Sequence, residues 1–185
     1  METRGLPLRV LVYASLFGAL TAVGAYISIP LYPVPITLQT MFTILAGLLL
    51  TGRTAALSQV VYVLLGVIGL PVFSGGKAGL GVLFGPTGGY LIGFIVAALV
   101  VGWLKQTKKD ASWPWYALCS VLGIIVIYVI GVLRLAQVAH MTLSKGLVVG
   151  ALPFLPGDAL KCTVSVLVAS KIVKHRRMRG EADLP

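Results

Sequence analysis

The feature that most constrains this chain is a series of long apolar runs with almost no charge. Hydrophobic residues make up 58% of its 185 residues and charged residues 11%, whereas soluble domains carry about 25% charged residues. This composition excludes a soluble enzyme and a disordered chain, and about 20 apolar residues suffice to cross a bilayer. We therefore predict a single all-α integral membrane domain with six transmembrane helices. The predicted spans are residues 10–29, 36–52, 54–70, 88–104, 113–133 and 159–173.

The sixth predicted span is short and contains Lys161 and Lys171. A helix of 15 residues with a rise of ~1.5 Å per residue reaches only ~22 Å. Lys171 can extend its ammonium group to the nearer membrane surface. We therefore expect the other end of this helix to begin below the opposite surface.

Lysine and arginine are concentrated on one side of the predicted bilayer. With a cytoplasmic N-terminus, 11 of them lie on the cytoplasmic side and 3, namely Lys77, Arg134 and Lys145, on the outer side. Cytoplasmic loops carry this excess in membrane proteins, so both termini are predicted to be cytoplasmic. The basic tail, residues 174–185, is interpreted as a topology anchor that contacts anionic lipid rather than nucleic acid. The cytoplasmic set is Arg4, Arg9, Arg53, Lys105, Lys108, Lys109, Lys171, Lys174, Arg176, Arg177 and Arg179.

Asp158 is the one acidic residue beside a predicted span, and Lys161 follows it by three positions. Residues three apart share a helix face, so the two can pair. One interpretation makes Asp158 an N-cap with Lys161 as its counter-ion. The interpretation we favour is functional, because ionisable groups inside a membrane are costly and usually serve a function. No further acid lies in the spans, so a ligand site fits better than a proton pump.

Two outer connections supply further candidate residues. The stiff segment Pro30–Pro35 precedes Thr37 and Gln39, which either bond to neighbouring helices or to a substrate. The connection 71–87 is glycine-rich and is predicted to form a lid or a pocket wall, with Phe73, Phe84 and Tyr90 as apolar surface. Its one charge, Lys77, is either solvated or attracts an anionic solute. A phosphate-binding loop is not indicated, because the GxxxxGK[ST] pattern is absent.

The first span carries a stripe of small residues, Ala14, Gly18 and Ala22. Such a stripe permits close approach of another helix, either within the chain or from a partner protein. His140 and His175 have no neighbouring ligands at metal spacing, so no metal or cofactor is expected.

Four segments in order resemble the BioY family, the biotin-specific S components of energy-coupling factor (ECF) transporters. The segments are Ile29–Thr40, Gly69–Phe73, Gly85–Tyr90 and Pro153–Lys161. The resemblance runs from the first span to the sixth. It implies an ECF S-component-like fold in a prokaryotic cell membrane, biotin uptake from outside, and assembly with a membrane T component and two cytoplasmic ATPases. It also favours Ala14, Gly18 and Ala22 as the partner-docking surface.

The resemblance suggests how the candidate residues would bind biotin. Asp158 would accept from the ureido N–H groups, and Lys161 would keep Asp158 ionised or donate to the ureido carbonyl. Lys77, with Lys161 as the rival, would meet the carboxylate. Gln39 and Thr37 would complete the polar contacts, while Phe73 and Tyr90 pack on apolar atoms. Two alternatives stay open from the residues alone: a stand-alone facilitator or channel for a small solute, and a membrane enzyme that uses Asp158 and Lys161.

Overall fold

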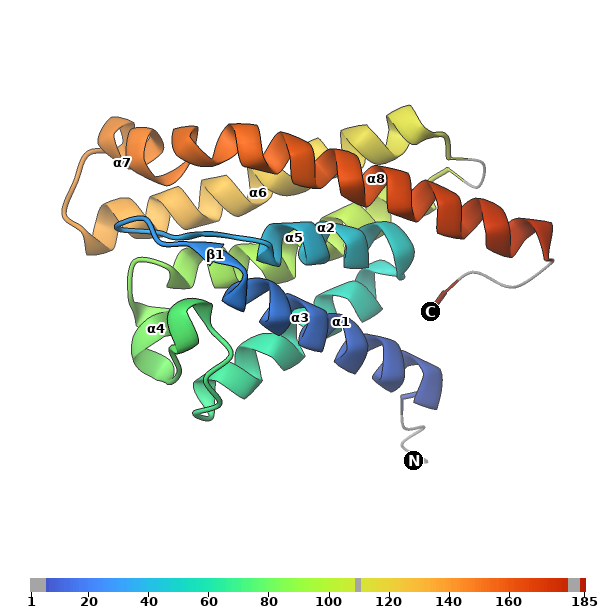
Figure 1. The fold of residues 1–185 in the computed structure, drawn as a ribbon, viewed down its shortest axis with the longest axis horizontal. Coiled ribbons are helices and arrows are strands. Elements are labelled where there is room, and N and C mark those ends of the chain that lie inside the picture. The colour runs from blue at the N-terminus through green and yellow to red at the C-terminus, as the bar shows by residue number, and fades with distance from the viewer. Residues whose placement is uncertain (1–5, 109–110, 180–183) are drawn as a thin grey trace.

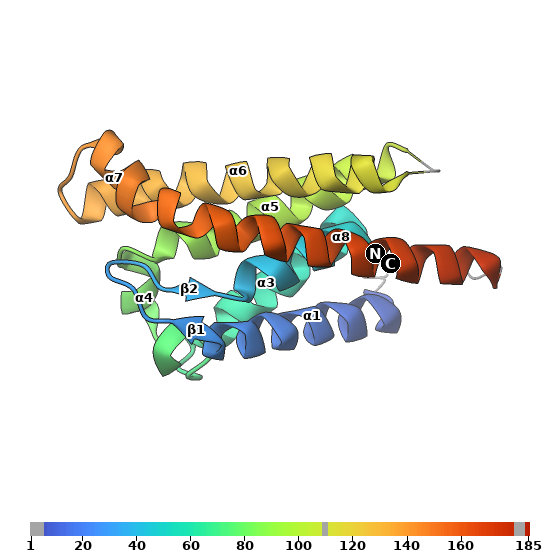
Figure 2. The same cartoon turned by 45° about the horizontal axis from the view of Figure 1, so that its top comes forward.

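The computed structural model describes residues 6–108, 111–179 and 184–185. Arg4, Lys109 and residues 180–183 of the predicted tail lie outside the described residues. Six long helices dominate the fold (Figures 1 and 2): α1 (Leu8–Tyr26), α2 (Gln39–Leu49), α3 (Gly52–Val67), α5 (Gly88–Gln106), α6 (Trp113–Val138) and α8 (Leu155–Met178). The connections contain a hairpin of β1 (Ser28–Ile29) and β2 (Ile36–Thr37), the short helices α4 (Leu80–Phe84) and α7 (Leu143–Gly150), and the 3-10 turns η1 (Ser74–Gly76) and η2 (Leu152–Phe154).

Each predicted span overlaps one of the six long helices, although the limits differ. Four helical segments are long and apolar enough to cross a membrane: α1, α5, α6 and the continuous stretch Leu143–Met178 that ends in α8. The other two, α2 with 11 residues and α3 with 16, are shorter. The structure therefore supports a membrane protein built of apolar helices, with four of the six predicted spans at full length.

The sixth helix differs most from its prediction. It has 24 residues, which at ~1.5 Å per residue is long enough to cross a bilayer. Pro156 lies in its first turn, where a missing N–H costs nothing. The helix thus extends beyond the predicted sixth span at both ends and continues through the first residues of the predicted tail to Met178. The first helix begins two residues before its predicted span and ends at Tyr26, where the chain turns into β1.

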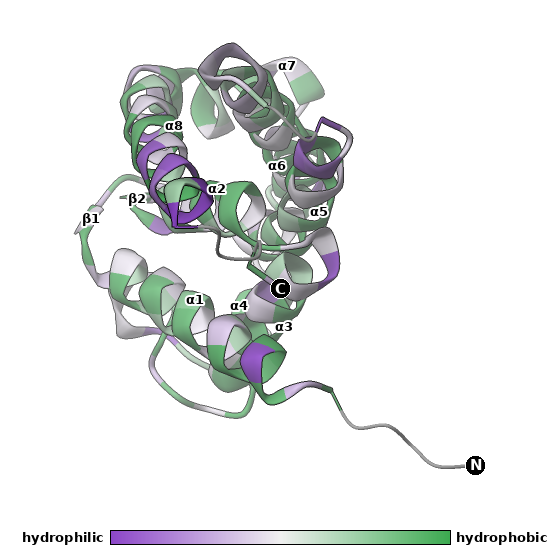
Figure 3. Cartoon of the chain, turned by 90° about the vertical axis from the view of Figure 1, so that its right-hand side faces the viewer, coloured by the Kyte–Doolittle hydropathy of each residue, from purple (hydrophilic) through white to green (hydrophobic). Residues whose placement is uncertain are grey.

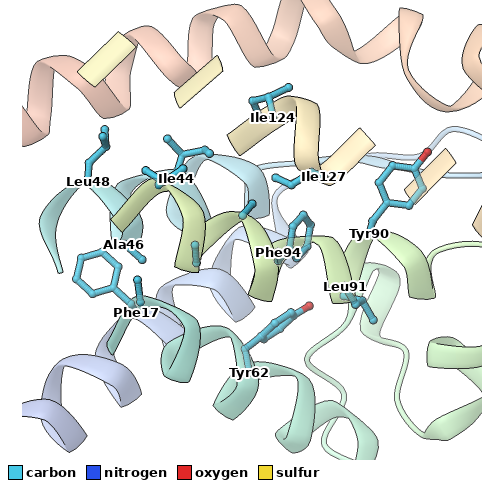
Figure 4. Close-up of a cluster of buried hydrophobic side chains, with 14 of the residues drawn as sticks. Phe17, Ile44, Ala46, Leu48, Tyr62, Tyr90, Leu91, Phe94, Ile124 and Ile127 are labelled. Atoms are coloured by element: carbon cyan, nitrogen blue, oxygen red, sulfur yellow. The ribbon is translucent and has the colours of Figure 1, made fainter. Parts of the chain in front are cut away.

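Helices α2 and α5 lie at the centre of the packing. Helix α5 contacts α2, α3 and α6, whereas α2 contacts α1, α5 and α8. Apolar side chains from these helices fill the core (Figure 4). A buried polar network joins three helices, because Gln59 of α3 accepts from Thr43 of α2 and donates to Thr21 of α1. Interhelical hydrogen bonds of this kind fix helix register inside membranes.

The outer surface of the helices is largely apolar. Exposed hydrophobic side chains include Leu16 and Val23 on α1, Ile125 and Val129 on α6, and Leu167 on α8. Seen from one end, most of the helical ribbon is hydrophobic, and hydrophilic residues gather near the ends of α1 and α8 (Figure 3). An apolar surface of this extent requires lipid or a partner as its neighbour.

The two ends of the helical bundle differ in structure. The β1–β2 hairpin, α4 and α7 lie at one end, here called the loop end. The start of α1, the end of α8 and both marked termini lie at the other, here called the tail end (Figure 1). The three connections predicted to be outside therefore share one end of the molecule.

Candidate functional site

A cavity of about 620 Å³ lies at the loop end, between the hairpin, the connection that carries η1 and α4, and helices α5, α6 and α8. This volume is in the range of small-molecule sites. All seven residues predicted to bind substrate line this loop-end cavity, although they are up to 124 positions apart in the chain. They are Thr37, Gln39, Phe73, Lys77, Tyr90, Asp158 and Lys161.

The charged part of the cavity is a buried ion pair in the first two turns of α8. The Lys161 Nζ lies 2.8 Å from Asp158 Oδ1, and the two side chains are 9% and 4% exposed. The predicted pairing of residues three apart is therefore confirmed. The N-cap interpretation of Asp158 is wrong: the N-cap of α8 is Phe154, and no side chain caps it.

Two hydroxyl groups from other helices complete the surroundings of the Asp158 carboxylate. Tyr128 of α6 donates to Oδ2, and Thr40 of α2 donates to Oδ1 across 3.2 Å. Lys161 also donates to the Thr40 hydroxyl, across 3.3 Å. An ionised carboxylate has about four acceptor sites. Three are used by described residues, so Oδ2 keeps room for one further donor.

A second polar group on the cavity wall lies at the start of α2. Thr37 donates to Gln39 Oε1 across 2.9 Å, and Gln39 Nε2 donates to the Tyr62 hydroxyl of α3 across 2.6 Å. Tyr62 in turn donates to the Val72 carbonyl across 3.2 Å. Both open interpretations of Thr37 and Gln39 thus have support, since these side chains bond to neighbouring residues and also face the cavity.

Aromatic side chains form much of the apolar wall. The Phe73 ring is 1% exposed and meets the Tyr62 ring edge-on, with centroids 5.7 Å apart. It lies so close to α3 that a Cβ on Gly66 would be 2.1 Å from the ring. On the opposite side, the Tyr90 hydroxyl donates to the Gly150 carbonyl across 2.7 Å. Figure 4 shows Tyr62, Tyr90, Phe94 and Ile127 in the same apolar cluster.

Lys77 differs from the other six predicted substrate-binding residues because it is exposed. It lies in the tight turn that follows Phe73, where the Phe73 N–H donates to the Lys77 carbonyl across 3.0 Å. Gly75 and Gly76 have φ of 72° and 70°, a left-handed conformation that glycine adopts without strain. These glycines let the connection fold over the cavity, as predicted for a lid or a wall.

Sequence reasoning missed the two residues that donate hydroxyl hydrogen bonds to Asp158, Thr40 and Tyr128, and several other lining residues. Thr40 follows Gln39 directly, and its hydroxyl group within an apolar run could have marked it as a candidate. Tyr128 lies in the middle of the fifth predicted span, where a tyrosine is rarely left without a partner. Within the described residues, no group of three or more His, Cys, Asp or Glu side chains is arranged to hold a metal ion. The missed apolar lining residues include Phe94, Ile127 and Phe154.

The small-residue stripe on α1 faces the inside of the protein. Ala14 is 1% exposed, and Ala22 packs against the core. Gly18 is also buried, and a Cβ added to it would lie 3.0 Å from the Ser58 carbonyl oxygen. The expectation that Ala14 and Gly18 form a partner-docking surface needs correction, because both are buried within the chain and α3 packs against Gly18.

Comparisons with known proteins agree with this architecture. The BioY family profile matches residues 1–178. The biotin transporter BioY of Thermotoga maritima is 45% identical over 167 residues, which cover 90% of this chain and 97% of that protein. The biotin transporter BioY of Rhizobium etli is 36% identical over 175 residues, with coverage of 89% and 93%.

One solved structure extends the comparison to the fold. The crystal structure of the S-component for biotin from an ECF-type ABC transporter aligns with a TM-score of 0.82 and 28% identity, and covers 100% of this chain and 97% of that one. The profile, the relatives and this structure match the chain along nearly its whole length. The chain is therefore a member of the BioY family.

Proposed function

We propose that this chain captures biotin from the extracytoplasmic side of a prokaryotic cell membrane, as the S component of an ECF-type vitamin uptake transporter. The observation that carries this proposal is the loop-end cavity with one buried Asp–Lys pair, in a chain of the BioY family. The curated relatives are named biotin transporters. No catalytic role is proposed, because an ion pair alone is weak evidence for chemistry.

The polar end of the cavity suits the ureido ring of biotin, which has two N–H donors and one carbonyl acceptor. The remaining acceptor site on Asp158 Oδ2 suits one ureido N–H in a charge-assisted bond. Lys161 has a third N–H besides those directed at Asp158 and Thr40, and this proton suits the ureido carbonyl. Thr37 and Gln39 would supply the remaining polar contacts.

The rest of the cavity suits the apolar part of biotin. Phe73 and Tyr90 would pack on the thiophane ring and the aliphatic chain. Lys77 is the better partner for the carboxylate, because Lys161 is buried and already paired, whereas Lys77 is exposed at the cavity wall. The two lysines would then bind opposite ends of the ligand.

Energy for uptake would come from an ECF module of a membrane T component and two ATPases docked on α1. Since Ala14 and Gly18 are buried, the accessible part of α1 is its outward face, where Ser15 and Ala19 are exposed. We expect Gly18→Leu to lower the melting temperature, and Ala19→Leu to reduce transport with biotin binding intact. Equal melting temperatures and equal transport for the two variants would contradict this assignment.

The direct test is saturable binding of radiolabelled biotin to the purified chain. Desthiobiotin keeps the ureido ring and is expected to compete. Lipoic acid has a similar acyl chain and carboxylate without the ureido group and is expected not to compete, because a site built on hydrogen bonds rejects ligands that lack the matching group. Absence of saturable binding, or equal competition by lipoic acid, would refute the proposal and favour a facilitator or channel for a small solute.

A further inference from the structure

A second cavity, of about 540 Å³, lies at the tail end of the molecule between the start of α6 and the end of α8. It is here called the tail pocket. Its principal lining residues are Trp113, Tyr116, Ser170, Lys174 and Arg177. None of these residues takes part in the proposed biotin site, so the tail pocket needs a separate explanation.

The tail pocket is positively charged on the side formed by α8. Ser170, Lys174 and Arg177 are spaced by four and three positions and therefore lie on one face of the helix. Lys174 and Arg177 are exposed. The charge of the tail pocket favours an anionic ligand.

Ser170 adds a hydrogen-bond donor inside the tail pocket. Its Oγ is buried and has no hydrogen-bond partner within the described part of the chain. Ser120 and Thr163, also in helices, donate instead to the carbonyl four positions earlier. A buried hydroxyl without a partner is unfavourable, so a ligand oxygen that accepts from Ser170 would remove this cost.

The surroundings of the tail pocket favour a lipid over a soluble anion. Trp113 starts α6 and is 68% exposed, and tryptophan is enriched at the level of the lipid headgroups. Beyond the pocket, exposed apolar side chains continue along both helices toward the loop end and offer a surface for acyl chains. They include Leu118, Val121, Leu122 and Ile125 on α6 and Val164, Leu167 and Val168 on α8.

We propose that the tail pocket binds the phosphate headgroup of an anionic phospholipid. Lys174 neutralises the phosphate, Ser170 donates to one of its oxygens, and Trp113 packs against the glycerol region. Basic pockets between membrane helices are suited to such headgroups. The site differs from a general attraction of the basic tail to a charged membrane. Lys174, which lines the pocket, should contribute more to lipid binding than Lys171, which does not line it.

Native mass spectrometry of the full chain in detergent tests this proposal, with phosphatidylglycerol as the probe and phosphatidylcholine of the same acyl chains as the reference. We expect phosphatidylglycerol to bind more tightly. Lys174→Gln should weaken its binding about fivefold, the factor that corresponds to one basic residue near an anionic lipid surface. Ser170→Ala should weaken it about two- to threefold.

Lys171→Gln is the matched control, because Lys171 is an exposed lysine of the same helix that does not line the pocket. It should change phosphatidylglycerol binding less than Lys174→Gln does, and biotin binding should be retained in all three variants as evidence of folding. Equal binding of the two lipids, or equal effects of the two lysine variants, would overturn the proposal. Displacement of phosphatidylglycerol by millimolar inorganic phosphate would overturn the choice of a lipid and indicate a soluble phosphate instead.

Discussion

The loop-end cavity and the tail pocket are similar in volume but place their charges differently. In the loop-end cavity the Asp158–Lys161 pair is almost completely buried and receives further hydrogen bonds from Tyr128 and Thr40. In the tail pocket the basic residues Lys174 and Arg177 are exposed.

This contrast separates two kinds of recognition. A buried ion pair with fixed partners has lost its hydration, so its remaining hydrogen-bonding groups can select a ligand by geometry. Exposed basic residues remain hydrated, so they attract anions with a strength that depends on salt. The loop-end cavity is therefore suited to a solute of defined shape and the tail pocket to the headgroup of a lipid.

The largest effect is expected from Asp158→Asn, which leaves the Lys161 ammonium buried without its counter-ion. Breaking a buried pair costs about 3–5 kcal/mol, so calorimetric titration should show biotin affinity reduced by at least about 100-fold. Phosphatidylglycerol binding at the tail pocket should not change.

The double variant Asp158→Asn with Lys161→Met is the control for this experiment, because it removes both charges. It should recover melting temperature relative to the single variant without recovering biotin binding. Unchanged biotin affinity in the single variant would show that Asp158 does not bind biotin, and the contrast between the two sites would then fail.

The second largest effect is expected from Gly66→Ala, which tests the apolar wall. The new methyl group would lie 2.1 Å from the Phe73 ring, so the ring must move, and overpacking of this kind costs about 1–3 kcal/mol. Biotin affinity should fall about tenfold or more. Gly146→Ala is the matched control, since Gly146 does not line the cavity and a Cβ there would lie no closer than 3.3 Å to a neighbouring atom. Equal affinities of these two variants would show that the position of Phe73 is unimportant.

Tyr128→Phe tests whether the partners of the buried carboxylate contribute to binding. A hydrogen bond to a charged group contributes about 1.5–3 kcal/mol, and part of it is lost from the bound state, so we expect roughly tenfold weaker biotin binding. Tyr116→Phe, at the tail pocket, is the control and should leave biotin affinity unchanged. Equal biotin affinities of the two variants would reject the proposed role of Tyr128.

The smallest effect is expected from Lys77→Ala, because this lysine is exposed. Exposed ion pairs contribute up to about 1 kcal/mol, so biotin affinity should fall less than about fivefold, and the difference should shrink at high salt. Lys145→Ala removes another exposed lysine of the loop end that does not line the cavity. An equally large loss in that control would reassign the effect to the general charge of the loop end.

The helices were predictable from the sequence to a useful degree. Each apolar run corresponds to a long helix, because burial in lipid requires an apolar run of fixed length. The limits of the helices were less predictable. The start of α8 was missed because Pro156 and Gly157 resemble the end of a loop, although proline is tolerated in a first helical turn.

The site was predictable in part. Polar residues near the ends of apolar runs are few, and for that reason Thr37, Gln39, Asp158 and Lys161 could be selected. Tyr128 was missed because its neighbours in the sequence are apolar, and its partner Asp158 lies 30 positions away. The role of the α1 stripe was also undecided from sequence, since an internal contact and a partner contact both require small residues.

The sequence by itself determined that this protein is a bundle of apolar helices with its basic residues gathered toward one end. Hydrophobicity and charge are properties of each segment of the chain, and they do not depend on which other helices pack against that segment. The tertiary structure alone decided that α3 covers Gly18 and that Thr40 reaches Asp158 across 118 positions. These contacts depend on how helices distant in sequence pack against one another, which the pattern of a single helix does not specify.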